Sequence, residues 1–250
     1  MRVGELLEEL RENILHDRSD RIEGSDDDRL WSDATLLRYL NEAQTRFAKK
    51  TTCLRSKITV RLIAGTNEYV LPENVIAVAS ARYGADTVDL IRAGHSMLGS
   101  YFAPSTKFYD TASFSRMPDG KVVAYTTDEE TSVNSNGSQQ SVTLRVFPTP
   151  LAAYTPGPLE LRVIRLPTCL EQDDLEAIPE IPADHHLNML DWAAYLALRI
   201  VDQDEENRER AAAFQTSFEQ HAKDALKEVM RKTFAPTNWG FGRGGFTWER

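Results

Sequence analysis

The chain has 250 residues, of which 41% are hydrophobic and 27% charged, so it can form one large globular domain or two small ones. Its net charge is −9, and acidic residues concentrate in residues 1–30 and 170–210, whereas residues 31–125 hold twelve bases and eight acids. This distribution argues against the strongly basic surface of a protein with high affinity for DNA.

The N-terminus and the cysteine content bear on the cellular compartment. Residues 1–15 are charged and lack the continuous apolar stretch of a secretory signal. No segment approaches the ~20 apolar residues that span a bilayer. Two cysteines, Cys53 and Cys169, are too few for a disulfide framework, and we expect reduced, buried thiols. The sequence therefore predicts a protein made in the cytoplasm, or part of something assembled there, with no membrane contact.

The N-terminal part has helical periodicity. Apolar residues at helical spacing predict a first helix over 3–15, which an acidic connection over 16–30 follows. A second helix is expected over 32–51, because Ser32 is a good N-cap and basic residues occupy the last turns. Its buried face should consist of Leu36, Leu40, Ala43 and Phe47.

Residues 57–166 have the patterns of strands and turns. The predicted strands are 58–62, 68–71, 75–83, 87–91, 121–126, 142–147 and 159–166. The polar stretch 128–141 is expected to be a loop. Since no helical pattern separates these strands, we expect an antiparallel sheet or a small sandwich.

Two amphipathic helices are predicted at 183–201 and 205–233, and their short junction makes them an antiparallel hairpin. The first should bury Leu187, Leu190, Ala194, Ala197 and Val201, and the second Ala211, Phe214, Phe218, Ala222, Ala225 and Val229.

The predicted fold class is therefore α+β. An antiparallel helical bundle, formed by residues 1–55 and 171–233, carries an inserted antiparallel β-sheet or sandwich domain over 56–170. Residues 234–250 form an extended C-terminal arm.

This arm places aromatic side chains among glycines, with too little sequence around them to form a core. We expect them to dock on a partner, because aromatic residues are strong interface anchors and a glycine-rich backbone is mobile when free. The candidate partner-binding residues of the arm are Phe234, Trp239, Phe241, Arg243, Phe246 and Trp248.

Motifs that would carry chemistry are weak, and we predict no catalytic residue, no metal ligand and no cofactor. Consecutive helical residues such as His185 and His186 point about 100° apart and cannot share one metal ion. The acidic runs 26–28 and 202–206 lack the register of a calcium loop. The spacing of glycines over 240–245 matches a dinucleotide fingerprint, but no helix can follow it.

Several motifs, in this order, resemble the head-to-tail adaptor proteins of tailed bacteriophages over residues 31–230. They are Trp31-Ser32-Asp33 with Leu36 and Leu40-Asn41-Glu42-Ala43; Ala64-Gly65-Thr66 with Tyr69 and Leu71-Pro72; Leu144 with Val146-Phe147-Pro148 and Pro150; Leu161 and Val163 with Leu166-Pro167; and Asp191-Trp192-Ala193-Ala194.

The resemblance implies a structural virion protein of the phage neck. Such adaptors pair a helical bundle with a β-rich domain and form a homo-oligomeric ring, commonly twelvefold, beneath the portal protein. The ring extends the channel for double-stranded DNA, which passes without specific binding, and provides a docking surface for tail tube, nozzle or fibre proteins. Two alternatives remain open, another tail or baseplate ring component and a metal-dependent hydrolase.

Overall fold

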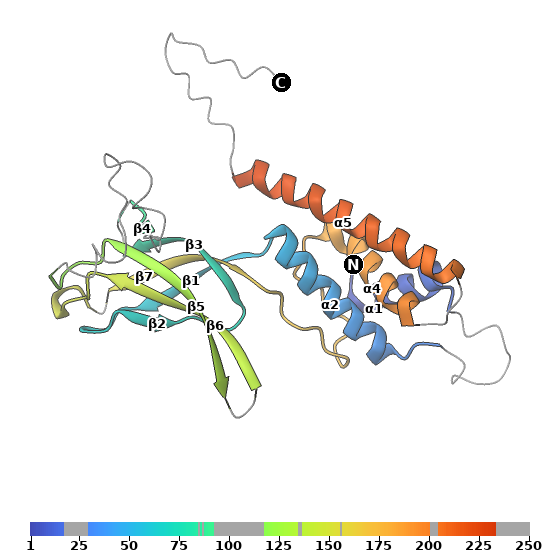
Figure 1. Ribbon diagram of the computed structural model, residues 1–250, viewed down its shortest axis with the longest axis horizontal. Coiled ribbons are helices and arrows are strands. Elements are labelled where there is room, and N and C mark those ends of the chain that lie inside the picture. The colour runs from blue at the N-terminus through green and yellow to red at the C-terminus, as the bar shows by residue number, and fades with distance from the viewer. Residues whose placement is uncertain are drawn as a thin grey trace, which may run out of the picture.

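The computed structural model describes residues 1–17, 30–84, 86, 88–92, 118–134, 137–155, 157–200 and 205–233. Helices and strands occupy separate ends of the molecule (Figure 1), which confirms the α+β class. The predicted arm, residues 234–250, lies outside the described residues. None of the described helices combines the length and hydropathy needed to cross a membrane.

The helical part contains α1 (Val3–Glu9), a π-helical segment η1 (Leu10–Leu15), α2 (Asp33–Thr51), α4 (His186–Ile200) and α5 (Glu205–Thr233). The predicted N-cap is confirmed, because the Thr35 amide donates to Ser32 Oγ over 3.3 Å. Lys49 and Lys50 lie in the last turn of α2, where cations are favoured by the helix dipole. Contacts between Asp191 and Ser217 and between His185 and Glu228 show that α4 and α5 run in opposite directions.

One hydrophobic cluster contains side chains of α1, η1, α2, α4 and α5. The predicted faces of α2 and α5 are buried in it up to Ala225, with Phe214 packed half-buried against it, and Val229 is half-buried. On α4 the predicted burial of Leu190, Ala194 and Ala197 is confirmed, and Val201 lies outside the described residues. The prediction for Leu187 is wrong, because this residue is exposed, and α4 also buries Met189 and Ala193. The reason is that α4 is apolar around most of its circumference, so its periodicity does not identify one face.

The strands form two sheets. One is antiparallel in the order β1 (Arg55–Arg61), β7 (Pro158–Arg165), β3 (Val75–Tyr83). The other has the order β2 (Glu68–Val70), β6 (Gly137–Phe147), β5 (Ala124–Asn134), β4 (Ile91–Arg92), and its β4–β5 pair is parallel rather than antiparallel as expected. Both sheets contribute side chains to a second hydrophobic cluster.

Two predictions about the strands are wrong. Of the loop predicted over 128–141, residues 128–134 and 137–141 are strand, because β5 and β6 pair continuously from Ala124↔Phe147 to Asn134↔Gly137, and residues 135–136 lie outside the described residues. Backbone hydrogen bonds between the two strands hold this hairpin and do not require apolar side chains. The polar sequence therefore lacks the apolar alternation by which a strand is predicted. In place of the strand predicted over 87–91, the described residues contain only the short β4.

Both cysteines are free, as expected. Cys53 is half-buried, and burial raises the pKa of its thiol. The expected burial is wrong for Cys169, which is exposed on the connection between β7 and α4.

Candidate interaction surfaces

Two of the helical motifs meet at Trp192, which is only 4% exposed. Its Nε1 donates to Glu42 Oε1 over 3.3 Å, and the Arg46 guanidinium carbon lies 3.8 Å from the centroid of its ring. The ring centroid of Phe218 on α5 is 5.2 Å away. The motif residues on α2 and α4 therefore join three helices through one indole.

Asn41 and Gln44 of α2 bind the backbone that connects the sheets to α4. Asn41 Nδ2 donates to the Leu170 carbonyl over 2.9 Å, and its Oδ1 accepts from the Leu170 amide over 2.7 Å. Gln44 Nε2 donates to the Thr168 carbonyl over 2.9 Å. A primary amide has both a donor and an acceptor, so Asn41 satisfies both backbone groups of Leu170, as a neighbouring strand would do.

The β motifs also serve the fold. Gly65 has φ of +75°, a conformation that favours glycine, and its amide donates to the Pro150 carbonyl over 3.0 Å. Tyr69 Oη donates to the Thr66 carbonyl over 2.8 Å and accepts from the Ile63 amide over 3.0 Å. The motifs therefore maintain turns and packing, and the interaction surfaces must be found among other residues.

An ion pair joins the end of β7 to the connection that precedes α4. Arg165 binds both carboxylate oxygens of Glu180, with distances of 2.6 and 3.1 Å, and the Thr168 amide also donates to Glu180 over 3.0 Å. The hydrogen bonds from Arg165 hold the pKa of the Glu180 carboxyl below its ordinary value. This pair fixes the connection where it leaves the sheet.

Replacing Glu180 with glutamine should lower the free energy of unfolding by about 1 kcal/mol at neutral pH, since the pair is partly exposed. Because the folded-state pKa is lowered, the stabilisation is present above the ordinary glutamate pKa and is lost as pH falls through the folded value. Urea unfolding between about pH 7 and pH 3 should therefore show a weaker acid dependence in Glu180→Gln. Glu73→Gln, at an exposed position, is the control. Equal profiles for Glu180→Gln and the wild type would contradict the prediction.

The histidine pair is held by structural contacts. His186 is buried, with Nε2 2.7 Å from the Ile181 carbonyl oxygen and Nδ1 3.1 Å from the Met1 amino group. The His185 ring packs 5.3 Å from the Phe47 ring. Within the described ranges, no three His, Cys, Asp or Glu side chains are grouped to hold a metal ion.

Sequence reasoning missed a polar chain of Asp191, Ser217 and His221. Ser217 Oγ donates to Asp191 Oδ2 over 2.7 Å and lies 3.3 Å from His221 Nε2. Burial raises the pKa of the Asp191 carboxyl. In a nucleophilic triad the histidine stands between the acid and the serine, whereas here the serine is in the middle. These hydrogen bonds link α4 to α5, and their order does not activate the Ser217 hydroxyl as a nucleophile.

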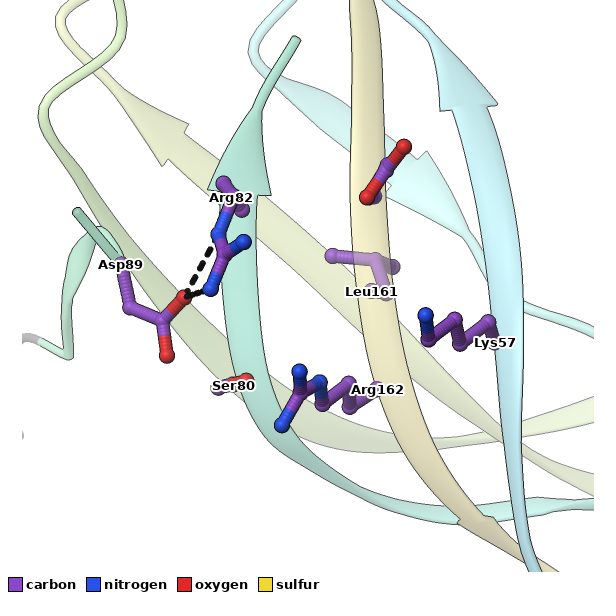
Figure 2. Close-up of a pocket in the computed structure, with 7 residues that line it drawn as sticks. Lys57, Ser80, Arg82, Asp89, Leu161 and Arg162 are labelled. Atoms are coloured by element: carbon purple, nitrogen blue, oxygen red, sulfur yellow. Dashed lines mark hydrogen bonds and ion pairs between the residues drawn. The ribbon is translucent and has the colours of Figure 1, made fainter. Parts of the chain in front are cut away.

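The outer side of the sheet β1-β7-β3 is basic. Alternation along the strands places Arg55 and Lys57 of β1 and Arg162 of β7 on this side, opposite the buried Leu161 and Val163. Lys57 is paired directly with Arg162 on the neighbouring strand, and both side chains line a shallow hollow on this side of the sheet (Figure 2). Arg61 and Arg82 complete this surface, which we call the basic face.

The connection after β7 exposes an acidic segment, residues 171–176, with the carboxylates of Glu171, Asp173, Asp174 and Glu176. Backbone hydrogen bonds of 2.9 Å from Val3 to Ala177 and from Gly4 to Leu175 hold it against α1. Leu175 is 46% exposed within it. The acidic block is visible in the sequence, but only the fold shows that residues 171–176 lie against α1.

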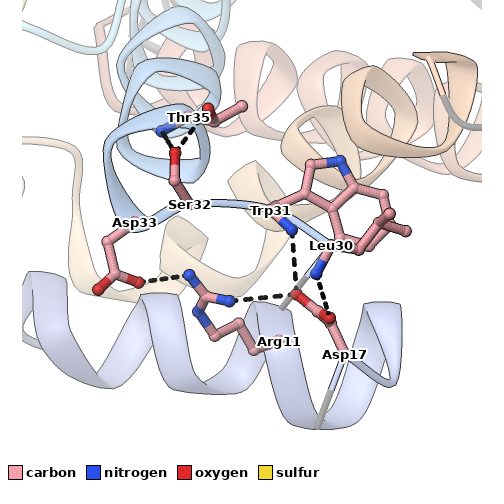
Figure 3. A network of polar contacts seen from close by, with 7 residues as sticks. All are labelled: Arg11, Asp17, Leu30, Trp31, Ser32, Asp33 and Thr35. Atoms are coloured by element: carbon pink, nitrogen blue, oxygen red, sulfur yellow. Dashed lines mark hydrogen bonds and ion pairs between the residues drawn. The ribbon is translucent and has the colours of Figure 1, made fainter. Parts of the chain in front are cut away.

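A buried ion pair joins the first helices (Figure 3). Arg11 on η1 contacts Asp17 over 3.1 Å and also contacts Asp33 on α2. Asp17 accepts in addition from the amides of Leu30, over 2.9 Å, and Trp31, over 3.4 Å. Asp17 thus holds the start of α2 against the end of η1.

The six predicted residues of the arm, from Phe234 to Trp248, lie outside the described residues. The described part is an α+β protein whose motif residues maintain packing and whose charges form two separate surfaces.

The model of the SU10 adaptor protein family matches residues 1–240, and the chain belongs to that family. This finding confirms the resemblance to phage head-to-tail adaptors. The protein is therefore a bacteriophage structural adaptor and a virion component, a class that interacts with portal and tail proteins in general. No curated protein matches the sequence.

Proposed function

We propose that this protein is a head-to-tail adaptor whose copies form a ring beneath the portal. In this role it binds no substrate and catalyses no reaction. The ring extends the DNA channel and gives the tail tube, nozzle or fibre proteins a surface on which to dock. The observation that carries this proposal is the family match over residues 1–240, which spans both the helices and the sheets.

The proposed division of labour follows two domains. A helical domain, residues 1–55 and 171–233, makes the ring, and a β-rich domain, residues 56–170, faces outward or towards the tail. Separate hydrophobic clusters in the helices and in the sheets support this division. A twelvefold ring is the number implied by the resemblance.

The proposed channel works by its shape and its charge. The protein carries a net charge of −9, and an acidic wall repels phosphate, so double-stranded DNA can slide past without being held. Proteins that bind DNA tightly instead neutralise several phosphates with Lys and Arg.

The arm, residues 234–250, is proposed to grip the portal through Phe234, Trp239, Phe241, Arg243, Phe246 and Trp248. Deleting residues 235–250 should lower the affinity for portal at least about 100-fold, because aromatic anchors at interfaces are worth about 2 kcal/mol or more each. Binding to purified portal particles, measured by sedimentation, tests this expectation.

Circular dichroism of the truncated protein should show an unchanged fold, since the hydrophobic clusters of the helices and of the sheets are built from residues between Val3 and Ala225, which the truncation retains. A full-length variant with Trp239, Phe241, Phe246 and Trp248 replaced by serine keeps the length and is the matched control. Undiminished binding of both variants would remove the arm from the proposal. Binding of the wild type to tail proteins but not to portal would instead indicate a tail or baseplate ring component.

A further inference from the structure

The basic face has an electrostatic cost within a single copy. Lys57 and Arg162 are directly opposite each other on neighbouring strands, an arrangement of like charges that destabilises a sheet. Asp89 binds Arg82, at 3.1 Å from its Nε, but neither Lys57 nor Arg162 has an ion-pair partner among the described residues (Figure 2). An anionic partner would relieve this repulsion.

The anion that fits this face is a set of protein carboxylates. A continuous phosphate backbone is disfavoured, because its closely spaced charges would also lie against Asp89 and Glu160, which line the same hollow. Separate carboxylates can approach the three cations Arg55, Lys57 and Arg162 individually. Arginine binds carboxylates in a bidentate fashion, which adds geometric specificity.

The chain itself contains a matching surface. In the acidic segment 171–176, Glu171, Asp173 and Asp174 have no ion-pair partner within the described part of the chain, whereas Glu176 contacts Arg2. The segment is bonded to α1 and lies along the helices, so it does not reach the sheet of its own copy (Figure 1). Among the described residues, three carboxylates and three cations without ion-pair partners, the latter being Arg55, Lys57 and Arg162, therefore occupy different surfaces of one molecule.

We propose that the basic face of one copy binds the acidic segment 171–176 of a second copy. Contact between two different surfaces of identical chains is heterologous, and repetition of such a contact closes a ring if the rotation permits. Exposed Leu175 adds an apolar contact, and Ile164 and Ala77 lie in register beside the cations to receive it. The inference rests on the proposed function and revises its division of labour, because the outer side of the sheet β1-β7-β3 also takes part in the contact between neighbouring copies.

The test is a charge exchange measured as assembly on purified portal by native mass spectrometry. Lys57→Glu/Arg162→Glu and Glu171→Lys/Asp173→Lys/Asp174→Lys should each raise the concentration needed for multi-copy assembly at least about 100-fold, because each faces like charges across the interface. A chain that carries all five substitutions should regain at least part of the assembly, since positions 57 and 162 again face opposite charges while Arg55 stays positive. Circular dichroism checks that each variant is folded.

We call Lys57→Glu/Arg162→Glu the face variant. Arg208→Glu/Lys223→Glu is its control, because it changes the net charge by the same amount as the face variant, at exposed positions of α5. Normal assembly of the face variant, failure of the fivefold exchange to restore assembly, or an equal loss in the control would each overturn the inference. Wild-type protein that binds portal without any contact between copies would overturn the proposed ring as well. Unimpaired assembly of the face variant leaves the ring intact and rejects only this contact.

Discussion

Replacing Trp192 with alanine is expected to lower the free energy of unfolding by about 3–5 kcal/mol, the cost of removing a large aromatic side chain from a core. The indole contacts α2 and α5 as well as its own helix, so its removal opens a cavity where three helices meet. It also leaves Arg46 without its stacking surface, although the Nε atom of Arg46 is already buried without a hydrogen-bond partner. Urea unfolding followed by circular dichroism measures this loss.

The matched control is Trp192→Phe, which keeps an aromatic ring but loses the N–H group that donates to Glu42. We expect it to cost about 1–2 kcal/mol, from the lost hydrogen bond and part of the packing. A double-mutant cycle with Arg46→Ala isolates the stacking energy. A Trp192→Ala variant within about 1 kcal/mol of the wild type would show that the helices do not depend on this contact.

Replacing Asp17 with alanine is expected to cost about 3 kcal/mol or more, because it leaves the buried Arg11 with only the partly exposed Asp33 as a partner and removes the acceptor of two backbone amides. The side chains of Arg11 and Asp17 are 8% and 7% exposed, and Asp17 also accepts from two backbone amides. The loss should appear in the urea midpoint and in faster hydrogen exchange of the first turns of α2.

Asp33→Ala is the control for this second prediction, because it removes the other carboxylate of the same network (Figure 3). The Asp33 side chain is 52% exposed, so its loss should cost no more than about 1 kcal/mol. Equal losses in the two variants would mean that burial of the Arg11–Asp17 pair does not set the energy.

The candidate surfaces were predicted only in part. Blocks of acidic and basic residues are visible in the sequence, but strand alternation and register decided that Arg55, Lys57 and Arg162 share one face. The composition of residues 234–250 predicts an arm, and its role remains a prediction. The motif residue Asn41 was recognised by resemblance, whereas its partner Leu170 became known only from the fold.

The sequence by itself determined the elements whose signals are local. Helix α2 has its N-cap, its apolar face and its terminal lysines within its own residues, and the predicted limits of α5 and β3 agree with the structure for the same reason. Tertiary structure decided everything that depends on a distant partner: the hairpin of β5 and β6, the exposed side of α4, and the pairing of Lys57 with Arg162. Local periodicity records which residues prefer burial, but the backbone or charge that each one meets is set only when remote segments pack together.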